Sequence, residues 1–284
     1  MDATMPARAA AEAESERPAS YRHTLTTRLT HWLSALAFFI LVGSGLQIFN
    51  AAPYLDASDK SNPEHRVLAF GATMAPDGVP YGYVDIFGKQ IKTTGLFGYT
   101  GDSMGHLTER AFPGWLTLPG YQDLADGRRW HFFFAWVFGL AGIAYLSRGA
   151  VRREFGLLIL RPADLPKIPP MALYYLRLRR EPPEHGKYNP MQKAAYTAVL
   201  FVLTPLIVLT GLALSPGFDA MTGPLVSLMG GRQFARLWHF ALMLALLGFV
   251  AGHLTMVIST GLWNNLRSMI TGFYVPKTHE GEGR

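Results

Sequence analysis

The sequence of 284 residues contains no cysteine. Disulfide bonds, zinc–thiolate sites, iron–sulfur clusters and haem attached through a C-x-x-C-H motif are therefore excluded. Charged residues are also scarce, at 16% of the chain, and they are nearly absent from several long apolar runs. No internal repeat with a period of roughly 20–50 residues is present. Any cofactor must be held by histidine, methionine, carboxylate or non-covalent packing.

The apolar runs are the dominant feature, because 49% of the residues are hydrophobic. A membrane-spanning helix needs about 20 consecutive apolar residues. The sequence predicts an all-α integral membrane protein, a four-transmembrane-helix bundle with a long outer loop between helices 1 and 2. The expected spans are residues 29–49, 130–146, 194–214 and 236–259.

The segments outside these spans differ in composition. Residues 1–20 have no apolar pattern and are expected to be a disordered cytoplasmic N-terminus, while 21–272 form the membrane domain and 273–284 a cytoplasmic tail. Between the spans lie an outer loop, 50–129, and a cytoplasmic loop, 148–193. Smaller expected features are a hairpin at 81–92, turns and short helices at 104–129, an interfacial helix at 171–180 and a helix start at 189–192.

The distribution of positive charge predicts the orientation. Most lysines and arginines lie in the N-terminus, in the 148–193 loop and in the C-terminal tail. Cytoplasmic segments of membrane proteins carry this excess of positive charge. Both termini are therefore expected in the cytoplasm, and the 50–129 loop is expected outside.

The fourth span carries two histidines, His239 and His253, although polar residues inside a membrane helix are costly and usually functional. Their spacing of 14 residues puts both on one face, roughly 21 Å apart along the axis. The predicted orientation places His131 at the outer level of His239, and His31 at the inner level of His253. The sequence therefore predicts two histidine pairs at two depths of the bilayer.

A pair of imidazoles at one depth is typical of a six-coordinate haem iron that transfers electrons. Glycines in three spans would give porphyrin planes room between the helices: Gly43, Gly45, Gly139, Gly142, Gly248 and Gly252. Two alternatives to haem remain open. The histidines could serve packing or a proton path, or they could bind another metal. Zinc is disfavoured because the spans contain no carboxylate or thiol.

Several motifs point to one family. They are RLTHW with VGSGLQIF in the first span, WHFFFAWVFG in the second, GKYNPMQK before the third, and the two histidines of the fourth. With these motifs the chain resembles, over about 21–272, the bacterial cytochrome b561 and nickel-hydrogenase b-type cytochrome family. That family includes the cytochrome subunits of formate dehydrogenase and thiosulfate reductase. The resemblance implies two non-covalent haems b, bound by His31, His131, His239 and His253, in a bacterial inner membrane.

The resemblance also implies a quinone site beside the cytoplasmic haem. The matching residues here are Asn189 and Gln192, with Met191 in place of a glycine that the formate dehydrogenase relative has. Asn189 and Gln192 also fit a helix cap, which is a purely structural role. Arginines flanking the spans are candidates for pairing with haem propionates: Arg28, Arg128, Arg129 and Arg267.

The outer loop resembles that of cytochromes that pair with periplasmic molybdopterin oxidoreductases. The expected function is a di-haem cytochrome subunit that carries electrons between the quinone pool and such a partner, without catalytic residues of its own and without nucleic acid. Two alternatives are the cytochrome subunit of a nickel–iron hydrogenase and a haem-free membrane anchor or transporter. His65 and His106 in the loop are expected to be surface residues.

Overall fold

The computed structural model describes residues 19–186 and 188–275. Its described part falls into two units with dense internal contacts. One unit is Leu33–Phe249, and the other consists of the described parts of Met1–Trp32 and Val250–Arg284. Most of the predicted disordered N-terminus and most of the predicted tail lie outside the described residues.

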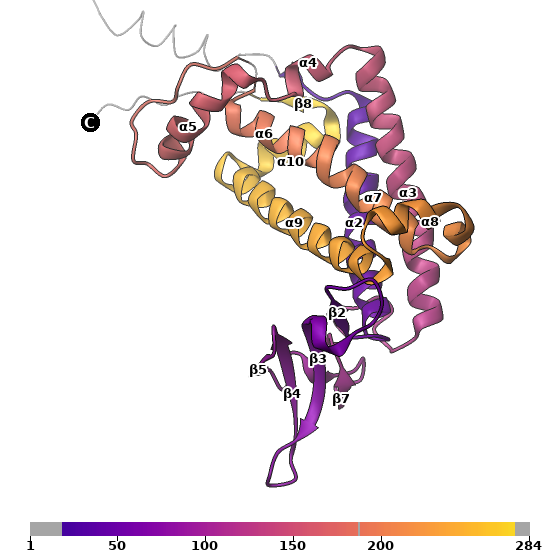
Figure 1. Ribbon diagram of the computed structural model, residues 1–284. Helices are drawn as coiled ribbons and strands as arrows, with labels where there is room; N and C mark the ends of the chain where they lie inside the picture. Colours follow the sequence, from indigo (N-terminus) through magenta and orange to yellow (C-terminus); the bar gives the residue numbers. More distant parts are fainter. Residues whose placement is uncertain (1–18, 187, 276–284) are drawn as a thin grey trace, which may run out of the picture. The chain divides into compact units, whose positions relative to one another are not determined.

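Within the described residues, four helical spans are long and apolar enough to cross a membrane, as predicted (Figure 1). They are α2 (Leu25–Phe49), α3 (Leu124–Val151), α6 to α7 (Pro190–Leu214) and α9 (Arg232–Ser259). Each begins before the predicted apolar run, because polar residues continue the helix toward the membrane surface. Helix α3, for example, is capped by Asp123, whose carboxylate accepts a hydrogen bond from the backbone N–H of Asp126 at 2.9 Å.

The third span is not one regular helix. It consists of α6 (Pro190–Ala198), the π-helical turn η3 (Val199–Leu203) and α7 (Thr204–Leu214). Pro205 has no backbone N–H to donate to the preceding turn, so a wider turn accommodates it. The third span therefore widens into a π-helical turn just before this proline.

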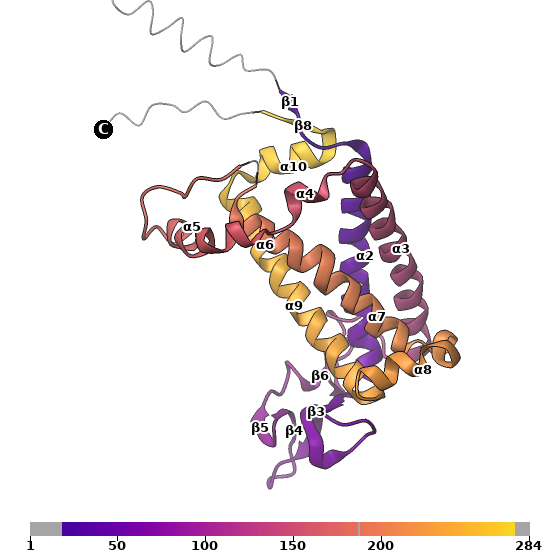
Figure 2. The same ribbon diagram turned by 45° about the horizontal axis from the view of Figure 1, so that its top comes forward.

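The segment between α2 and α3, residues 50–123, contains strands, so the expected all-α fold is wrong here. We call it the strand segment. A four-stranded antiparallel sheet has the order β2-β3-β4-β5, and β6 pairs with β7. Figure 2 shows these strands grouped at one end of the spanning helices. Their bounds are β2 (Tyr54–Asp56), β3 (Arg66–Met74), β4 (Pro80–Ile86), β5 (Lys89–Lys92), β6 (Gly98–Gly101) and β7 (Leu107–Arg110).

The hairpin predicted at 81–92 is present as β4 and β5, joined at Phe87 and Gly88. The turns and short helices predicted at 104–129 are only partly right, because β7 forms a strand and α3 begins at Leu124. Glycine allows the two sheets to touch. A Cβ on Gly98, which has a φ of +76°, would lie 2.3 Å from the carbonyl oxygen of Gly71.

An aromatic core joins the strand segment to the helices. Its buried members include Phe49 at the end of α2 and Phe70 and Phe112 in the strand segment. Phe240 of α9 packs against this core, with its ring centroid 5.2 Å from that of Phe49. The strand segment is therefore fixed to the ends of two spanning helices.

Short helices follow α3: α4 (Phe155–Leu158), the 3-10 turn η2 (Pro162–Lys167) and α5 (Ile168–Tyr175). The interfacial helix predicted at 171–180 is thus too long. Arg177 has a φ of +60°, which a right-handed helix does not allow. After α7 comes α8 (Asp219–Leu228), which leads to α9.

The smaller unit contains the start of α2, the end of α9 and helix α10 (Leu262–Thr271). The sequence did not predict α10, which lies between the fourth span and the expected tail. Glycines with positive φ, Gly261 and Gly272, flank it. The strands β1 (Ser20–Tyr21) and β8 (Phe273–Tyr274) pair beyond it.

Candidate functional site

The histidines of the spanning helices lie in two pairs. In the larger unit, His131 of α3 faces His239 of α9, with ring centroids 6.2 Å apart. In the smaller unit, His31 of α2 faces His253 of α9, with centroids 6.3 Å apart. These are the same pairs that the depth argument predicts. We call them the outer pair and the inner pair, after their predicted sides.

Both separations fit one metal ion held between two rings. Metal–imidazole bonds are about 2 Å long, so two rings on opposite sides of a metal have centres roughly 6 Å apart, once half of each ring is added. Neither pair belongs to a group of three or more histidine or carboxylate side chains within the described part of the chain. Two ligands suit a haem iron, whose other four ligands are the porphyrin nitrogens, better than tetrahedral zinc.

The outer pair has hydroxyl partners that the sequence analysis missed. The Oγ of Ser44, in α2, lies 3.1 Å from Nδ1 of His131. The Oγ1 of Thr210, in α7, lies 2.9 Å from Nδ1 of His239. Both hydroxyl residues are buried. The sequence contains one available signal, a hydroxyl residue directly before a glycine in an apolar span, at 44–45 and again at 210–211.

A close crossing of α2 and α3 positions His131. A Cβ on Gly127 would lie 2.9 Å from Cγ of Gln47, so only glycine permits this approach. Gln47 is 1% exposed, and its Nε2 donates to the carbonyl oxygen of Tyr121 at 2.9 Å. Gly127 and His131 are four residues apart and share a face of α3, which turns the imidazole toward α2.

The inner pair is surrounded by different groups. Trp32 donates from Nε1 to the carbonyl oxygen of Met269 at 3.0 Å, and Arg28 donates from one terminal nitrogen to the carbonyl oxygen of Ile270. Two buried nitrogens here, Nε of Arg28 and Nδ1 of His31, have no hydrogen-bond partner among the described residues. Buried donors without a partner are rare, so these atoms fit an acceptor supplied by a bound group.

The candidate quinone residues form a capping box at the start of α6. Asn189 accepts from the backbone N–H of Gln192 at 2.9 Å, and Gln192 accepts from that of Asn189 at 3.1 Å. The Nδ2 of Asn189 also donates to the hydroxyl of Tyr175 at 2.9 Å. The amide of Asn189 is thus committed to holding the chain, which leaves the amide nitrogen of Gln192 as the better candidate for a ligand.

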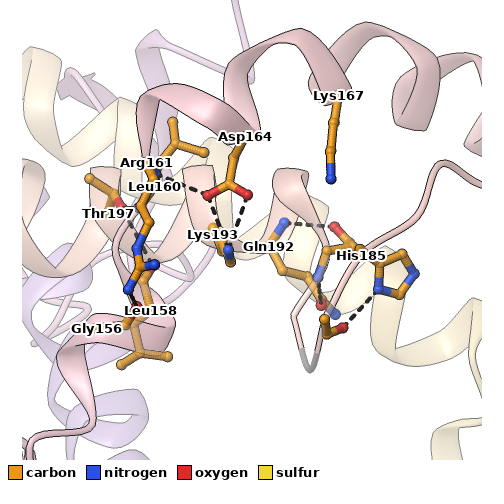
Figure 3. Close-up of polar contacts among 12 residues, drawn as sticks. Gly156, Leu158, Leu160, Arg161, Asp164, Lys167, His185, Gln192, Lys193 and Thr197 are labelled. Atoms are coloured by element: carbon orange, nitrogen blue, oxygen red, sulfur yellow. Dashed lines mark hydrogen bonds and ion pairs between the residues drawn. The ribbon is translucent and has the colours of Figure 1, made fainter.

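A cavity of about 130 Å³ lies near this helix start. Its lining residues are Gly156, Leu157, Arg161, Gly186, Tyr188 and Lys193. Figure 3 shows Lys193 pointing to Asp164 and Arg161 reaching Gly156. The backbone N–H of Arg161 and then the ammonium of Lys193 hold the pKa of Asp164 below its usual range.

The other predicted residues have separate roles. The side chains of Arg129 and His106 are exposed. A terminal nitrogen of Arg129 forms an ion pair with Oδ1 of Asp126 at 2.9 Å, and Nδ1 of His106 lies 3.7 Å from Oδ2 of Asp102. His65 belongs to a short 3-10 turn of the strand segment. A Cβ at Gly139, Gly142, Gly248 or Gly252 would meet no atom of the described residues within 4 Å, so these helix faces have room.

Spanning helices with facing histidines define a membrane cytochrome of the b type. The family model for prokaryotic cytochrome b561 matches residues 22–272, and the chain belongs to that family. Its members bind haem b. A protein of Azospira oryzae named protein-methionine-sulfoxide reductase subunit YedZ1 is 29% identical over 244 residues, which is 83% of this chain and 89% of that protein. A cytochrome named YdhU in Escherichia coli K12 is 36% identical over 92 residues, or 31% of this chain and 33% of that one.

Proposed function

We propose that the protein is a di-haem membrane cytochrome subunit that carries electrons between the quinone pool and a redox partner on the outer face. The observation that supports this most directly is the presence of two facing imidazole pairs, with ring centroids 6.2 and 6.3 Å apart. His131 and His239 would hold one haem b, and His31 and His253 the other. Bound haem supplies one-electron chemistry, while the chain supplies ligands, orientation and an apolar surrounding.

Helix α9 would connect the two haems. It contributes one ligand to each pair, and it is continuous from Arg232 to Ser259. The 14-residue spacing corresponds to roughly 21 Å along the axis. At the inner pair, Arg28 is the candidate partner for a haem propionate, because its buried Nε has no partner in the described part of the chain.

The proposed orientation puts the strand segment outside and both termini in the cytoplasm of a bacterium, with the spans in its inner membrane. The strand segment would then be the docking side for the partner. A molybdopterin oxidoreductase is the partner that the loop resemblance favours. The name of YedZ1 favours a protein-methionine-sulfoxide reductase, and a nickel–iron hydrogenase is a third candidate.

For the quinone, we propose the start of α6, on the cytoplasmic side. The amide nitrogen of Gln192 would contact the headgroup, and Asn189 would hold the backbone of this turn. The neighbouring cavity supports the proposal, because Tyr188 and Lys193 provide polar groups and Leu157 an apolar wall. Gln192→Glu should raise the KM for quinol without changing the haem content. An unchanged KM would remove Gln192 from the quinone site.

The central test is the haem content of the purified full-length protein. A pyridine haemochrome assay should give two haems b per chain, and one of them should disappear in His131→Ala. One haem in the unaltered protein would restrict the proposal to a single pair. A folded protein without haem, made with ample haem supply, would refute the cytochrome function and favour a membrane anchor or transporter.

A further inference from the structure

The two histidines of the outer pair contact similar two-residue sites on different helices. Ser44 and Gly45 of α2 lie beside His131, and Thr210 and Gly211 of α7 lie beside His239. In each case the hydroxyl lies at hydrogen-bonding distance from Nδ1 of the ring, and a Cβ added to the glycine would lie against Cε1. We call these the two histidine seats.

The hydroxyl of Ser44 determines which nitrogen of His131 carries the proton. Its Oγ lies 2.6 Å from the carbonyl oxygen of Ile40, which is the length of an O–H···O hydrogen bond. A hydroxyl has one proton and can accept through its lone pairs. With the proton directed to Ile40, Ser44 accepts from Nδ1–H of His131, so Nε2 is left with a free lone pair.

Thr210 has the same arrangement. Its Oγ1 lies 3.0 Å from the carbonyl oxygens of Leu206 and Ile207 in the preceding turn, and 2.9 Å from Nδ1 of His239. A proton shared with these carbonyls again makes the hydroxyl the acceptor for Nδ1–H. In the neutral form of each ring, this arrangement places the proton on Nδ1 and leaves Nε2 with a free lone pair, the form that binds iron.

The glycine of each histidine seat leaves the ring space that a side chain would fill. A Cβ at Gly45 would lie 3.3 Å from Cε1 of His131, and a Cβ at Gly211 would lie 3.3 Å from Cε1 of His239. Such contacts are tighter than a ring and a methyl group normally make. Since Cε1 lies between the two ring nitrogens, an added methyl group would shift Nε2 as well.

We propose that Ser44, Gly45, Thr210 and Gly211 are positioning residues that set the tautomer, the ring orientation and the iron potential of the outer haem. The inference rests on the proposed ligation by His131 and His239. A hydrogen bond from the distal ring nitrogen raises the basicity of a ligand histidine. A more basic ligand stabilises ferric iron, so the seats lower the midpoint potential of the outer haem. At the inner pair, no hydroxyl of the described residues takes this place beside His31, whose Nδ1 has no partner among them.

The test is a redox titration of the full-length protein, followed in the visible spectrum, together with electron paramagnetic resonance of the ferric state. Thr210→Val removes the hydroxyl and keeps the side-chain shape. The midpoint potential of one haem should rise and its resonance should shift, while the other haem stays unchanged. Retention of the outer haem should weaken on the order of 10-fold to 100-fold. Thr210→Ser should restore the unaltered values, and Ser44→Ala should act like Thr210→Val.

Thr222→Val is the matched control. Thr222 is also buried and donates to the carbonyl oxygen four residues before it, at 3.0 Å, but it lies in α8. It should leave both haems unchanged. For the glycines, Gly45→Ala should alter the outer haem, whereas Gly43→Ala, which would meet Leu118 instead, should not.

Distinct outcomes separate the seats from the haem ligation. If His131→Ala and His239→Ala keep two haems, the proposed ligation itself is wrong. If those variants lose one haem but Thr210→Val and Ser44→Ala shift no potential, only the seats are refuted. Equal shifts in both haems, or loss of haem in Thr210→Val and Thr222→Val alike, would also refute the seats, because general destabilisation explains them.

Discussion

The ring of Phe49, the last residue of α2, lies 5.2 Å from the ring of Phe240 on α9, measured between centroids. Phe49 also contacts Phe70 and Phe112 of the strand segment, at centroid distances of 5.7 and 5.6 Å. Phe240 directly follows His239. The core of the strand segment and α9, the helix that carries His239, are therefore packed into one structure.

Phe49→Ala should loosen this structure. Replacing a buried phenylalanine by alanine typically costs about 3–5 kcal/mol, and Phe49 is 8% exposed. We expect a lower melting temperature and faster proteolysis of the strand segment. Ile91→Ala, at a position 53% exposed on β5, should change neither quantity much. Equal behaviour of the two variants would show that the Phe49 core does not hold the strand segment.

A buried arginine holds the chain between β7 and α3. Arg110 is 3% exposed and donates to the carbonyl oxygens of Phe112 and Gly120, at 2.7 and 3.1 Å, and to Oγ1 of Thr117 at 3.0 Å. In Arg110→Met these buried acceptors lose their donor, at about 1–3 kcal/mol for each group left unpaired. Proteolysis within 112–120 should become faster, whereas the exposed Lys89→Met should leave it unchanged.

The sequence predicted the membrane part of this fold well. The length of the apolar runs identified all four spans found in the described residues, because a helix needs about 20 apolar residues to cross a bilayer. It also predicted which histidines face each other, because His239 and His253 share one helix face and the loops determine the direction of each span. The hairpin at 81–92 was recognisable from the alternation around Phe87 and Gly88.

Other features depended on contacts that a single chain segment does not reveal. The short strands β6 and β7 form because Gly98 and Gly71 allow two sheets to touch, and such contacts leave no periodicity in the sequence. Ser44 and Thr210 were overlooked because a hydroxyl in an apolar helix usually bonds its own backbone. Only the packing of α3 and α9 brings imidazoles to these two hydroxyls.

Single histidine variants should separate the two proposed haems. His131→Ala should lose one haem, because His239 alone would supply only one of the two imidazole ligands. His253→Ala should lose the other haem, and the remaining one should keep its spectrum. Pyridine haemochrome analysis with a reduced-minus-oxidised spectrum measures both. His106→Ala, in the strand segment, serves as the control and should keep two haems. An unchanged ratio of haem to protein in His253→Ala would contradict the inner site.

The ion pair between Asp164 and Lys193 should make the 156–193 region sensitive to acid. The backbone N–H of Arg161 and the ammonium of Lys193 lower the pKa of Asp164 from its ordinary 3.8. A carboxylate with a lowered pKa contributes stability that is present above about pH 4 and is lost as the pH falls through the lower value. Proteolysis of the 156–193 region should therefore increase below about pH 4. In Asp164→Asn it should already be increased at neutral pH and should depend less on acid, whereas a response equal to that of the unaltered protein would contradict this role.

The absence of cysteine offers a direct test of the proposed orientation, because any single introduced cysteine is the only thiol in the chain. Lys89→Cys on β5 and Glu181→Cys after α5 both replace exposed residues. A membrane-impermeant maleimide applied to intact spheroplasts should label Lys89→Cys at once and Glu181→Cys only after permeabilisation. The opposite pattern would put the strand segment in the cytoplasm. The outer pair would then lie on the cytoplasmic side, and an external redox partner could not reach the strand segment.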